Sequence, residues 1–335
     1  MIELLERLCK LDATSGDEDV VRAFIRREIE GYCTCHVDAM GNIIAEKTGK
    51  NRAARRVMLD AHMDEVGLII SAVTPDGFLK FHTVGGMETA VLTARRVTVN
   101  GRCGVIAVKP VHLCDSEERK KLPKQDALVI DIGAKSRDEA LDFVSPGDRA
   151  VLCSEWMETD EKICSKALDD RVGCAILIRL LQEESAFDFT ATFSVQEEVG
   201  CRGAKAAAFA VAPDAAVILE GTTAADLADV PAERQVCVQG HGAAVSFMDG
   251  GTLYDRKFYD AALHSGILCQ PKAAVTGGNN AMAVHQSRTG VRTVAVSVPC
   301  RYIHSATSVA DKRDMDSALQ LARFLKDGIA GGTVG

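Results

Sequence analysis

The apolar runs of this sequence follow two different patterns, and their order along the chain limits the folds that it can adopt. Up to residue 70 and again from residue 165, apolar runs of strand length alternate with segments of helical periodicity, such as "RRVMLDAHM" and "DDRVGCAILIRLLQEE". Residues 71–164 instead contain short β-rich runs separated by Gly, Asn and Asp. The pattern predicts an α/β domain with a largely parallel sheet at 1–70 and 165–335, and an inserted small all-β domain at 71–164.

A helix is predicted near the N-terminus. One helical stripe is formed by the apolar residues Val20, Val21, Phe24, Ile25 and Ile29. Ser15 and Glu18 precede it at the spacing of a capping box, so we expect their side chains to bond to the first backbone amides of the helix.

The composition and the charge exclude several classes of protein. The 335 residues carry a formal net charge of -8, whereas a nucleic-acid-binding protein needs a basic face. No run approaches the roughly 18 apolar residues of a membrane-spanning helix, and no basic leader precedes an apolar segment. The 12 cysteines are scattered through apolar segments, which is typical of reduced thiols. We therefore expect a cytoplasmic protein that binds neither nucleic acid nor a membrane.

Charged side chains interrupt five otherwise apolar segments. "LDAHMDEVGLII" at 59–70 contains Asp60, His62, Asp64 and Glu65, which are costly to bury unless something holds them. Similar groups occur in "KALDDRVG", "SVQEEVGCRGA", "VILEGTTAAD" and "PCRYIHSATSVAD". The carboxyl ends of parallel strands form one edge of a sheet, and ligands bind there. We therefore expect these groups to converge, although they are spread over most of the chain.

Each of these segments has an ordinary structural explanation when it is considered alone. Asp169 and Asp170 are typical of a helix N-terminus, and Glu197 and Glu198 are typical of a solvated strand end. Together, however, two histidines and at least four acids would concentrate negative charge without a counter-ion. A pair of divalent cations resolves this imbalance. Imidazole and carboxylate ligands suit zinc, and they also suit cobalt and manganese.

Five segments also resemble, in the correct order, the signature motifs of one peptidase family. They are "AHMDEVG", "KALDDRVG", "QEEVGCRGA", "LEGTTAAD" and "RYIHSATSVAD". The family is that of the tetrahedral (TET-type) metallo-aminopeptidases, also named glutamyl aminopeptidases, deblocking aminopeptidases or endoglucanase M. The resemblance implies a zinc-peptidase-like three-layer sandwich with a β-barrel-like insertion that mediates dimerisation and restricts access. It also implies peptide substrates and a homo-oligomer, commonly a dodecamer.

The resemblance further implies a set of metal ligands. One divalent ion would be held by His62, Asp169 and Glu220. The second would be held by Asp169, Glu198 and His304, so that the carboxylate of Asp169 bridges the two ions. Two metals that share a bridging carboxylate can also share an activated water.

Two further residues receive catalytic roles from the resemblance. Asp64 would accept the second N–H of the His62 imidazole and fix its tautomer. Glu197 would be the general base that moves a proton from water to the leaving amine. The family also implies a cis peptide bond at Asp169–Asp170. Because adjacent strand residues point to opposite faces, Glu197 and Glu198 are expected to lie where their strand ends.

The sequence departs from the family pattern at two places and leaves other functions open. Glu220 is an Asp in many relatives, and Asn279–Asn280 replaces a more usual Thr-Asp pair, so substrate preference is not carried over. A deacylase or a carboxypeptidase could use the same metal cluster. A glycoside hydrolase could use paired acids, although that chemistry does not explain His62 and His304. An assembly protein with an inactive site is the non-enzymatic alternative.

Overall fold

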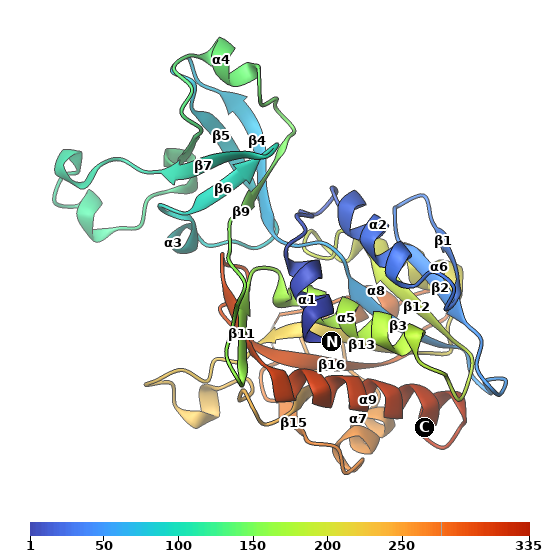
Figure 1. Cartoon of the computed structure of the whole chain (residues 1–335). Helices are drawn as coiled ribbons and strands as arrows, with labels where there is room; N and C mark the ends of the chain where they lie inside the picture. Colours follow the sequence, from blue (N-terminus) through green and yellow to red (C-terminus); the bar gives the residue numbers. More distant parts are fainter. Residues whose placement is uncertain (276) are drawn as a thin grey trace.

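The protein consists of a large sheet covered by helices and a separate closed barrel (Figure 1). The structure is a computed structural model that describes residues 1–275 and 277–335. The barrel is formed by the middle of the chain and projects from the larger part. The predicted α/β fold with a small inserted β structure is confirmed.

The centre of the main sheet is parallel. Four strands follow one another in the order β12 (Phe189–Ser194), β3 (Val57–His62), β13 (Ala215–Thr223) and β16 (Arg292–Arg301). Strands joined through antiparallel pairs extend the sheet: β1 (Thr34–Val37), β2 (Ile43–Lys47), β10 (Met157–Glu158), β11 (Lys162–Ser165), β14 (Ala243–Ser246) and β17 (Ser308–Asp311). Strand β15 (Cys269–Lys272) then pairs with β14 in parallel. The parallel centre places the carboxyl ends of β3, β12, β13 and β16 at one edge.

Helices cover both faces of this sheet, which gives the three predicted layers (Figure 1). The helices are α1 (Ile2–Cys9), α2 (Asp19–Glu28), α5 (Leu168–Gln182), α6 (Arg202–Val211), α7 (Arg256–Leu263), α8 (Ala281–Val284) and α9 (Lys312–Ala330). Leu59 of β3 packs in the core with α1, α2, α5, α7 and α9, whereas Met58 packs with α6 and α8. Adjacent strand residues thus serve opposite faces. Within the described residues, no helix combines the length and apolarity that a bilayer crossing requires.

The barrel is closed in the strand order β4-β5-β8-β7-β6-β9. Its elements are β4 (Gly67–Val73), β5 (Leu79–Val84), α3 (Thr89–Leu92), β6 (Arg96–Val99), β7 (Arg102–Ala107), β8 (Val129–Asp131), α4 (Arg137–Leu141) and β9 (Arg149–Leu152). Its interior is filled by apolar side chains such as Leu68, Val97, Ile106 and Ile130, separate from the core of the main sheet. The division of the chain into domains at 71 and 164 stays a prediction.

The expected capping box of the N-terminal helix is wrong. Helix α2 begins at Asp19, and its N-cap residue Glu18 makes no side-chain cap bond. Ser15 Oγ instead donates to Asp64 Oδ2 at 2.6 Å, and Glu18 Oε1 accepts from the backbone N–H groups of Gly16 and Gln196. The two side chains therefore tie the N-terminal segment to the polar sheet edge.

Candidate metal centre and active site

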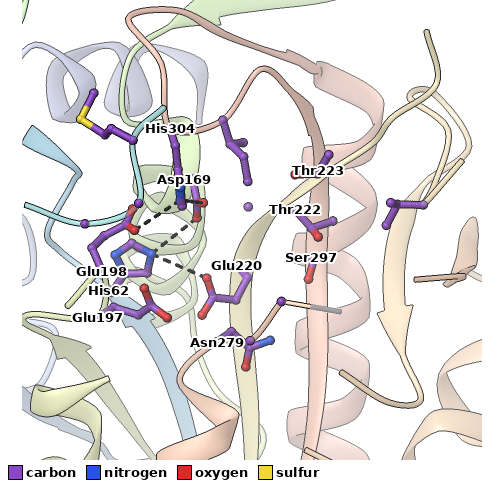
Figure 2. A pocket seen from close by; sticks show the side chains of 18 of the residues that line it. His62, Asp169, Glu197, Glu198, Glu220, Thr222, Thr223, Asn279, Ser297 and His304 are labelled. Atoms are coloured by element: carbon purple, nitrogen blue, oxygen red, sulfur yellow. Dashed lines mark ion pairs between the residues drawn. The ribbon is translucent and has the colours of Figure 1, made fainter. Parts of the chain in front are cut away.

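The polar strand ends line one cavity of about 840 Å³ (Figure 2). His62 is the last residue of β3, Glu220 lies near the end of β13, and Glu198 follows β12 in a turn. Asp169 lies at the start of α5, and His304 follows β16. The expectation that the five segments converge at the carboxyl edge of the sheet is thus confirmed.

His62, Asp169 and Glu220 form the first group of possible metal ligands. His62 Nε2 lies 3.5 Å from Asp169 Oδ1 and 3.7 Å from Glu220 Oε2. The three ligand atoms lie within 4.8 Å of one another. These are the residues that the resemblance gives to one metal, and the ends of β3 and β13 and the start of α5 bring them together.

Asp169, Glu198 and His304 form the second group. His304 Nε2 lies 3.6 Å from Asp169 Oδ2 and 3.3 Å from Glu198 Oε2. The two oxygens of Asp169 therefore face different histidines, as a bridging carboxylate requires. The peptide bond between Asp169 and Asp170 is cis, as the resemblance implies.

The donor set fits divalent cations. The acidic cluster, which we define as His62, Asp169, Glu197, Glu198, Glu220 and His304, makes no ion pair with a lysine or arginine in the described chain. Two buried carboxylate oxygens, Asp169 Oδ1 and Glu198 Oε1, have no hydrogen-bond partner. Buried anionic oxygens without partners are costly, and cations would satisfy them.

Without cations, the acidic cluster can lower its charge only by binding protons. Burial raises the pKa of Glu198 to about 8 and raises that of Glu220 well above its usual range. Burial opposes protonation of His304, but Asp169 and Glu198 raise its pKa to about 9. Such shifts are typical of sites where a bound cation balances the charge.

Asp64 lies beside His62, but its carboxylate does more than the resemblance implies. His62 Nδ1 is closest to the backbone carbonyl of Asp64, at 3.1 Å, and the carboxylate is 3.4 Å away. The carboxylate accepts the backbone N–H groups of Glu197 and Glu198, at 3.0 and 3.1 Å. Burial alone would raise the pKa of Asp64, but its contacts with His62, Ser15 and these amides lower it. Asp64 thus fixes the turn that carries both glutamates.

Glu197 lies beyond the end of β12, where the sequence predicts it, and faces the cavity (Figure 2). Its carboxylate forms a group with the carboxylate of Glu198 and the imidazole of His62, in which the ligand atoms lie within 4.8 Å of one another. Cys201 Sγ donates to Glu197 Oε1 at 3.4 Å. Burial raises the pKa of Glu197 above its usual range, which suits a group that both accepts and donates a proton.

Asp60, Asp64 and Glu65 of the segment 59–70 do not line the cavity. Asp60 is buried behind it and accepts from Thr192, Ser194 and Asn280. Asn280 also donates to Ser194 Oγ and thus links Asp60 of β3 to Ser194 of β12.

Glu65 belongs instead to a separate ion cluster, in which Glu65, Lys166 and Arg171 are buried and Asp12 is half-exposed. Lys166 Nζ lies 2.6 and 2.8 Å from the two oxygens of Glu65, and 3.1 Å from Asp12 Oδ1. Arg171 Nη2 lies 3.3 Å from Glu65 Oε1. We call Asp12, Glu65, Lys166 and Arg171 the paired cluster. Sequence reasoning missed it because its members are separated by up to 159 positions along the chain and form no motif.

Comparison with known proteins identifies the family. The sequence profile of the M42 glutamyl aminopeptidase family matches residues 41–321. A protein of Acetivibrio thermocellus with an aminopeptidase name is 34% identical over 96% of this chain and 97% of its own length. The aminopeptidase APDkam598 of Desulfurococcus kamchatkensis shares 33% identity with a TM-score of 0.92, covering 97% of this chain and 94% of its own.

A second similar solved structure is that of a peptidase that forms large oligomers. The TET1 peptidase of Pyrococcus horikoshii, which can form a tetrahedron or a large octahedral shell, shares 33% identity with a TM-score of 0.84. The match covers 97% of this chain and 98% of that one. Because the family profile and these relatives span nearly the whole chain, this protein belongs to the M42 glutamyl aminopeptidase family.

Proposed function

We propose that this protein is a metal-dependent aminopeptidase that removes N-terminal residues from peptides. The observation that carries the proposal is the pair of histidine–carboxylate groups that share Asp169 at the floor of a cavity. His62, Asp169 and Glu220 would hold one divalent ion, and Asp169, Glu198 and His304 the other. Zinc, cobalt and manganese all accept such ligands.

The bound ions would supply Lewis-acid polarisation of the scissile carbonyl and would lower the pKa of the attacking water. Glu197 accepts a proton from that water and donates it to the nitrogen of the leaving group. The hydrogen bond from Cys201 Sγ to the Glu197 carboxylate, and the hydrogen bond from the Glu197 backbone N–H to Asp64, hold Glu197 in place for both transfers. The acids of the cavity attract the positively charged α-amine of a substrate, which favours cleavage at a free N-terminus.

The test is hydrolysis of aminoacyl-p-nitroanilides and short peptides with free and acetylated N-termini, before and after chelation. We expect release only from free N-termini, loss of activity on chelation, and recovery with zinc, cobalt or manganese. Metal content is measured in parallel on wild type and Asp169→Asn, which is expected to bind fewer ions. Cleavage of the acetylated substrates alone would contradict the proposal and favour a deacylase.

We also propose that the chain assembles into a homo-oligomer, commonly a dodecamer in this family. The similarity to the Pyrococcus horikoshii TET1 peptidase supports this. Light scattering on the purified protein tests it, and a monomer at micromolar concentration would contradict it.

A further inference from the structure

The two groups of possible metal ligands are supported by different parts of the fold. In the first group, His62 ends β3 and Glu220 lies in β13, and the two residues are only 1% and 5% exposed. Their further polar contacts come from the loops of the main sheet. His62 Nδ1 meets the backbone carbonyl of Asp64 at 3.1 Å, and Glu220 Oε1 accepts from the backbone N–H of Asn280 at 3.4 Å. The main sheet and its loops thus hold the first group.

The second group faces the barrel. After β5 the chain bends at Gly85 and Gly86, and both residues line the cavity. Gly85 lies against Glu198, because a Cβ added at Gly85 would be 3.2 Å from Glu198 Cβ. Gly86 lies against His304, because a Cβ added there would be 3.5 Å from Nδ1 of the imidazole. Two consecutive barrel residues therefore contact the two ligands that the second group does not share with the first.

The loop that carries His304 is also attached to the barrel. Ala306 is 5% exposed and packs in the apolar interior of the barrel. Thr307 Oγ1 lies 3.4 Å from Oγ of Ser154, which follows β9. The His304 side chain itself is 34% exposed, whereas that of His62 is 1% exposed. His304 is thus held less by burial than by the attachment of its loop to the barrel.

Gly85 occupies a position that suits only glycine. Its φ is +85°, which is a left-handed conformation that other residues rarely adopt. A Cβ at this position would also lie 2.8 Å from Val66 Cγ1, which is closer than van der Waals contact. Because Gly85 has no side chain, its backbone can pack directly against Glu198. A larger residue would have to push Val66 or Glu198 aside.

We propose that the barrel positions Glu198 and His304, the two unshared ligands of the second ion. The positioning residues are Gly85, Gly86 and Ala306, and the first ion does not depend on them. The proposal rests on the proposed metal centre and adds a role for the barrel in it. Groups that orient a metal ligand without touching the metal typically change the metal affinity about 10- to 100-fold when they are substituted.

The test measures the affinity of each site for zinc, by competition with a chromophoric chelator, in wild type and Gly85→Ala. We expect Gly85→Ala to weaken binding of the second ion about 10- to 100-fold and to leave binding of the first unchanged. Gly101→Ala is the matched control. Gly101 lies in the barrel turn between β6 and β7 with a φ of +77°, and an added Cβ would meet no other group within 4 Å. It imposes similar backbone strain without contacting a ligand, so both affinities should be kept.

Double variants show which site is weakened. Glu220→Gln removes a ligand of the first group, and Glu198→Gln removes a ligand of the second. Adding Gly85→Ala to Glu220→Gln should lower the zinc content further, whereas adding it to Glu198→Gln should change nothing. Ala306→Gly removes one methyl group from the barrel interior and should weaken the second ion a few-fold. Because Ala306→Gly introduces no clash, it tests the proposal even if Gly85→Ala does not fold.

Equal weakening of both ions in Gly85→Ala would overturn the inference, as would wild-type affinity for both ions in Gly85→Ala and Ala306→Gly. In each of these cases the wild-type protein still binds metal and cleaves free N-termini, so the proposed function stands. A wild-type protein that binds no zinc, cobalt or manganese and hydrolyses no free N-terminus would overturn the proposed function itself.

Discussion

Two clusters of charged side chains differ in how their charge is balanced, and residues at or just beyond the end of β3 contribute to both. His62 belongs to the acidic cluster and Glu65, three residues later, to the paired cluster. In the paired cluster, the two acids Asp12 and Glu65 meet Lys166 and Arg171, so the formal charges cancel. The acidic cluster contains four carboxylates and two histidines, with no lysine or arginine paired to them in the described chain.

The comparison shows how the same desolvation penalty can serve stability or function. A buried acid that meets a lysine is neutralised by the fold itself, and the pair then has no need of a ligand. A buried acid that meets only other acids and histidines has a charge that the fold does not balance, and it can bind a cation. We therefore expect substitutions in the acidic cluster to change activity and metal binding, and substitutions in the paired cluster to change stability.

The largest effect is expected at Glu197. Glu197→Gln removes the proton acceptor but keeps the size of the side chain, so kcat should fall by about 10²- to 10⁴-fold. Steady-state kinetics on the preferred aminoacyl-p-nitroanilide measure the loss, and metal analysis should find the ion content unchanged.

Glu88→Gln is the control for this loss, because Glu88 lines the same cavity but is exposed and belongs to neither ligand group. It should keep kcat within a few-fold. If Glu197→Gln kept wild-type kcat, the assignment of the general base would be wrong.

The second effect is a loss of stability in the paired cluster. Lys166→Met keeps the length of the side chain but leaves Glu65 buried with one cation fewer, which should lower the free energy of unfolding by about 3–5 kcal/mol. Urea unfolding followed by circular dichroism measures this change.

Lys50→Met gives the matched comparison, because the ion pair of Lys50 with Glu184 lies at the surface. The two side chains are 67% and 82% exposed. Exposed ion pairs contribute about 0–1 kcal/mol to the free energy of unfolding, so Lys50→Met should change it little. A Lys166→Met protein as stable as Lys50→Met would show that the paired cluster is not a stabilising element.

The third effect is stabilisation of the acidic cluster by metal. A free metal concentration of about 100 times the Kd should raise the free energy of unfolding by about 2.7 kcal/mol for each site. Thermal unfolding with and without a chelator tests this in wild type and in Glu198→Gln, where the gain should be smaller. The paired cluster is not expected to bind metal. Lys166→Met should therefore keep the full metal-dependent gain in the free energy of unfolding. Equal stability of wild type with and without metal would contradict the assignment.

The sequence predicts most of the fold and the membership of the site, because both depend on local patterns. Alternating helices and strands predict the α/β fold, and the turn-rich segment at 71–164 predicts the barrel. His62, Glu198 and Glu220 are recognisable because a charged group at the end of an apolar strand is conspicuous. Strand ends in a parallel sheet share an edge, so the convergence also follows from the sequence.

The partners of buried side chains could not be predicted in the same way. Ser15 has the spacing of a helix cap, but tertiary contact with Asp64 overrides that local preference. Glu65 has the same sequence context as Asp64, yet a lysine 101 positions later turns it away from the cavity. Gly85 is an ordinary turn residue in the sequence, and its contact with Glu198 follows only from how the barrel packs against the sheet edge. Such contacts depend on register and packing, which a single sequence does not encode locally.

The smallest expected effect concerns a buried acid that belongs to neither cluster. Asp314 of α9 is fully buried, and its carboxylate accepts the backbone N–H groups of Gly240 and Gly242 at 2.8 and 2.7 Å. Burial raises its pKa from 3.8 to about 6. The hydrogen bonds from the two backbone amides oppose this rise in pKa, as does the positive charge of Lys162, whereas the negative charge of Asp311 adds to it. Both oxygens of Asp314 thus accept a hydrogen bond, but the carboxylate forms no ion pair within the described residues. Its charge is therefore balanced less completely than that of the paired cluster and more completely than that of the acidic cluster.

Its protonation should make stability depend on pH. Because the pKa is higher in the folded state, the contribution of Asp314 to stability is complete below pH 3.8 and is lost as the pH rises through 6. In Asp314→Asn this titration is absent. The stability of wild type relative to Asp314→Asn should therefore fall by about 1 kcal/mol between pH 4 and pH 7, after allowance for solvent screening. Urea unfolding of metal-free wild type and variant at both pH values measures the difference, in which the titrations common to both proteins cancel. A constant difference would show that hydrogen bonds from neutral amides stabilise a buried carboxylate as well as a paired lysine does, and that the contrast between the two clusters depends on hydrogen bonding rather than charge.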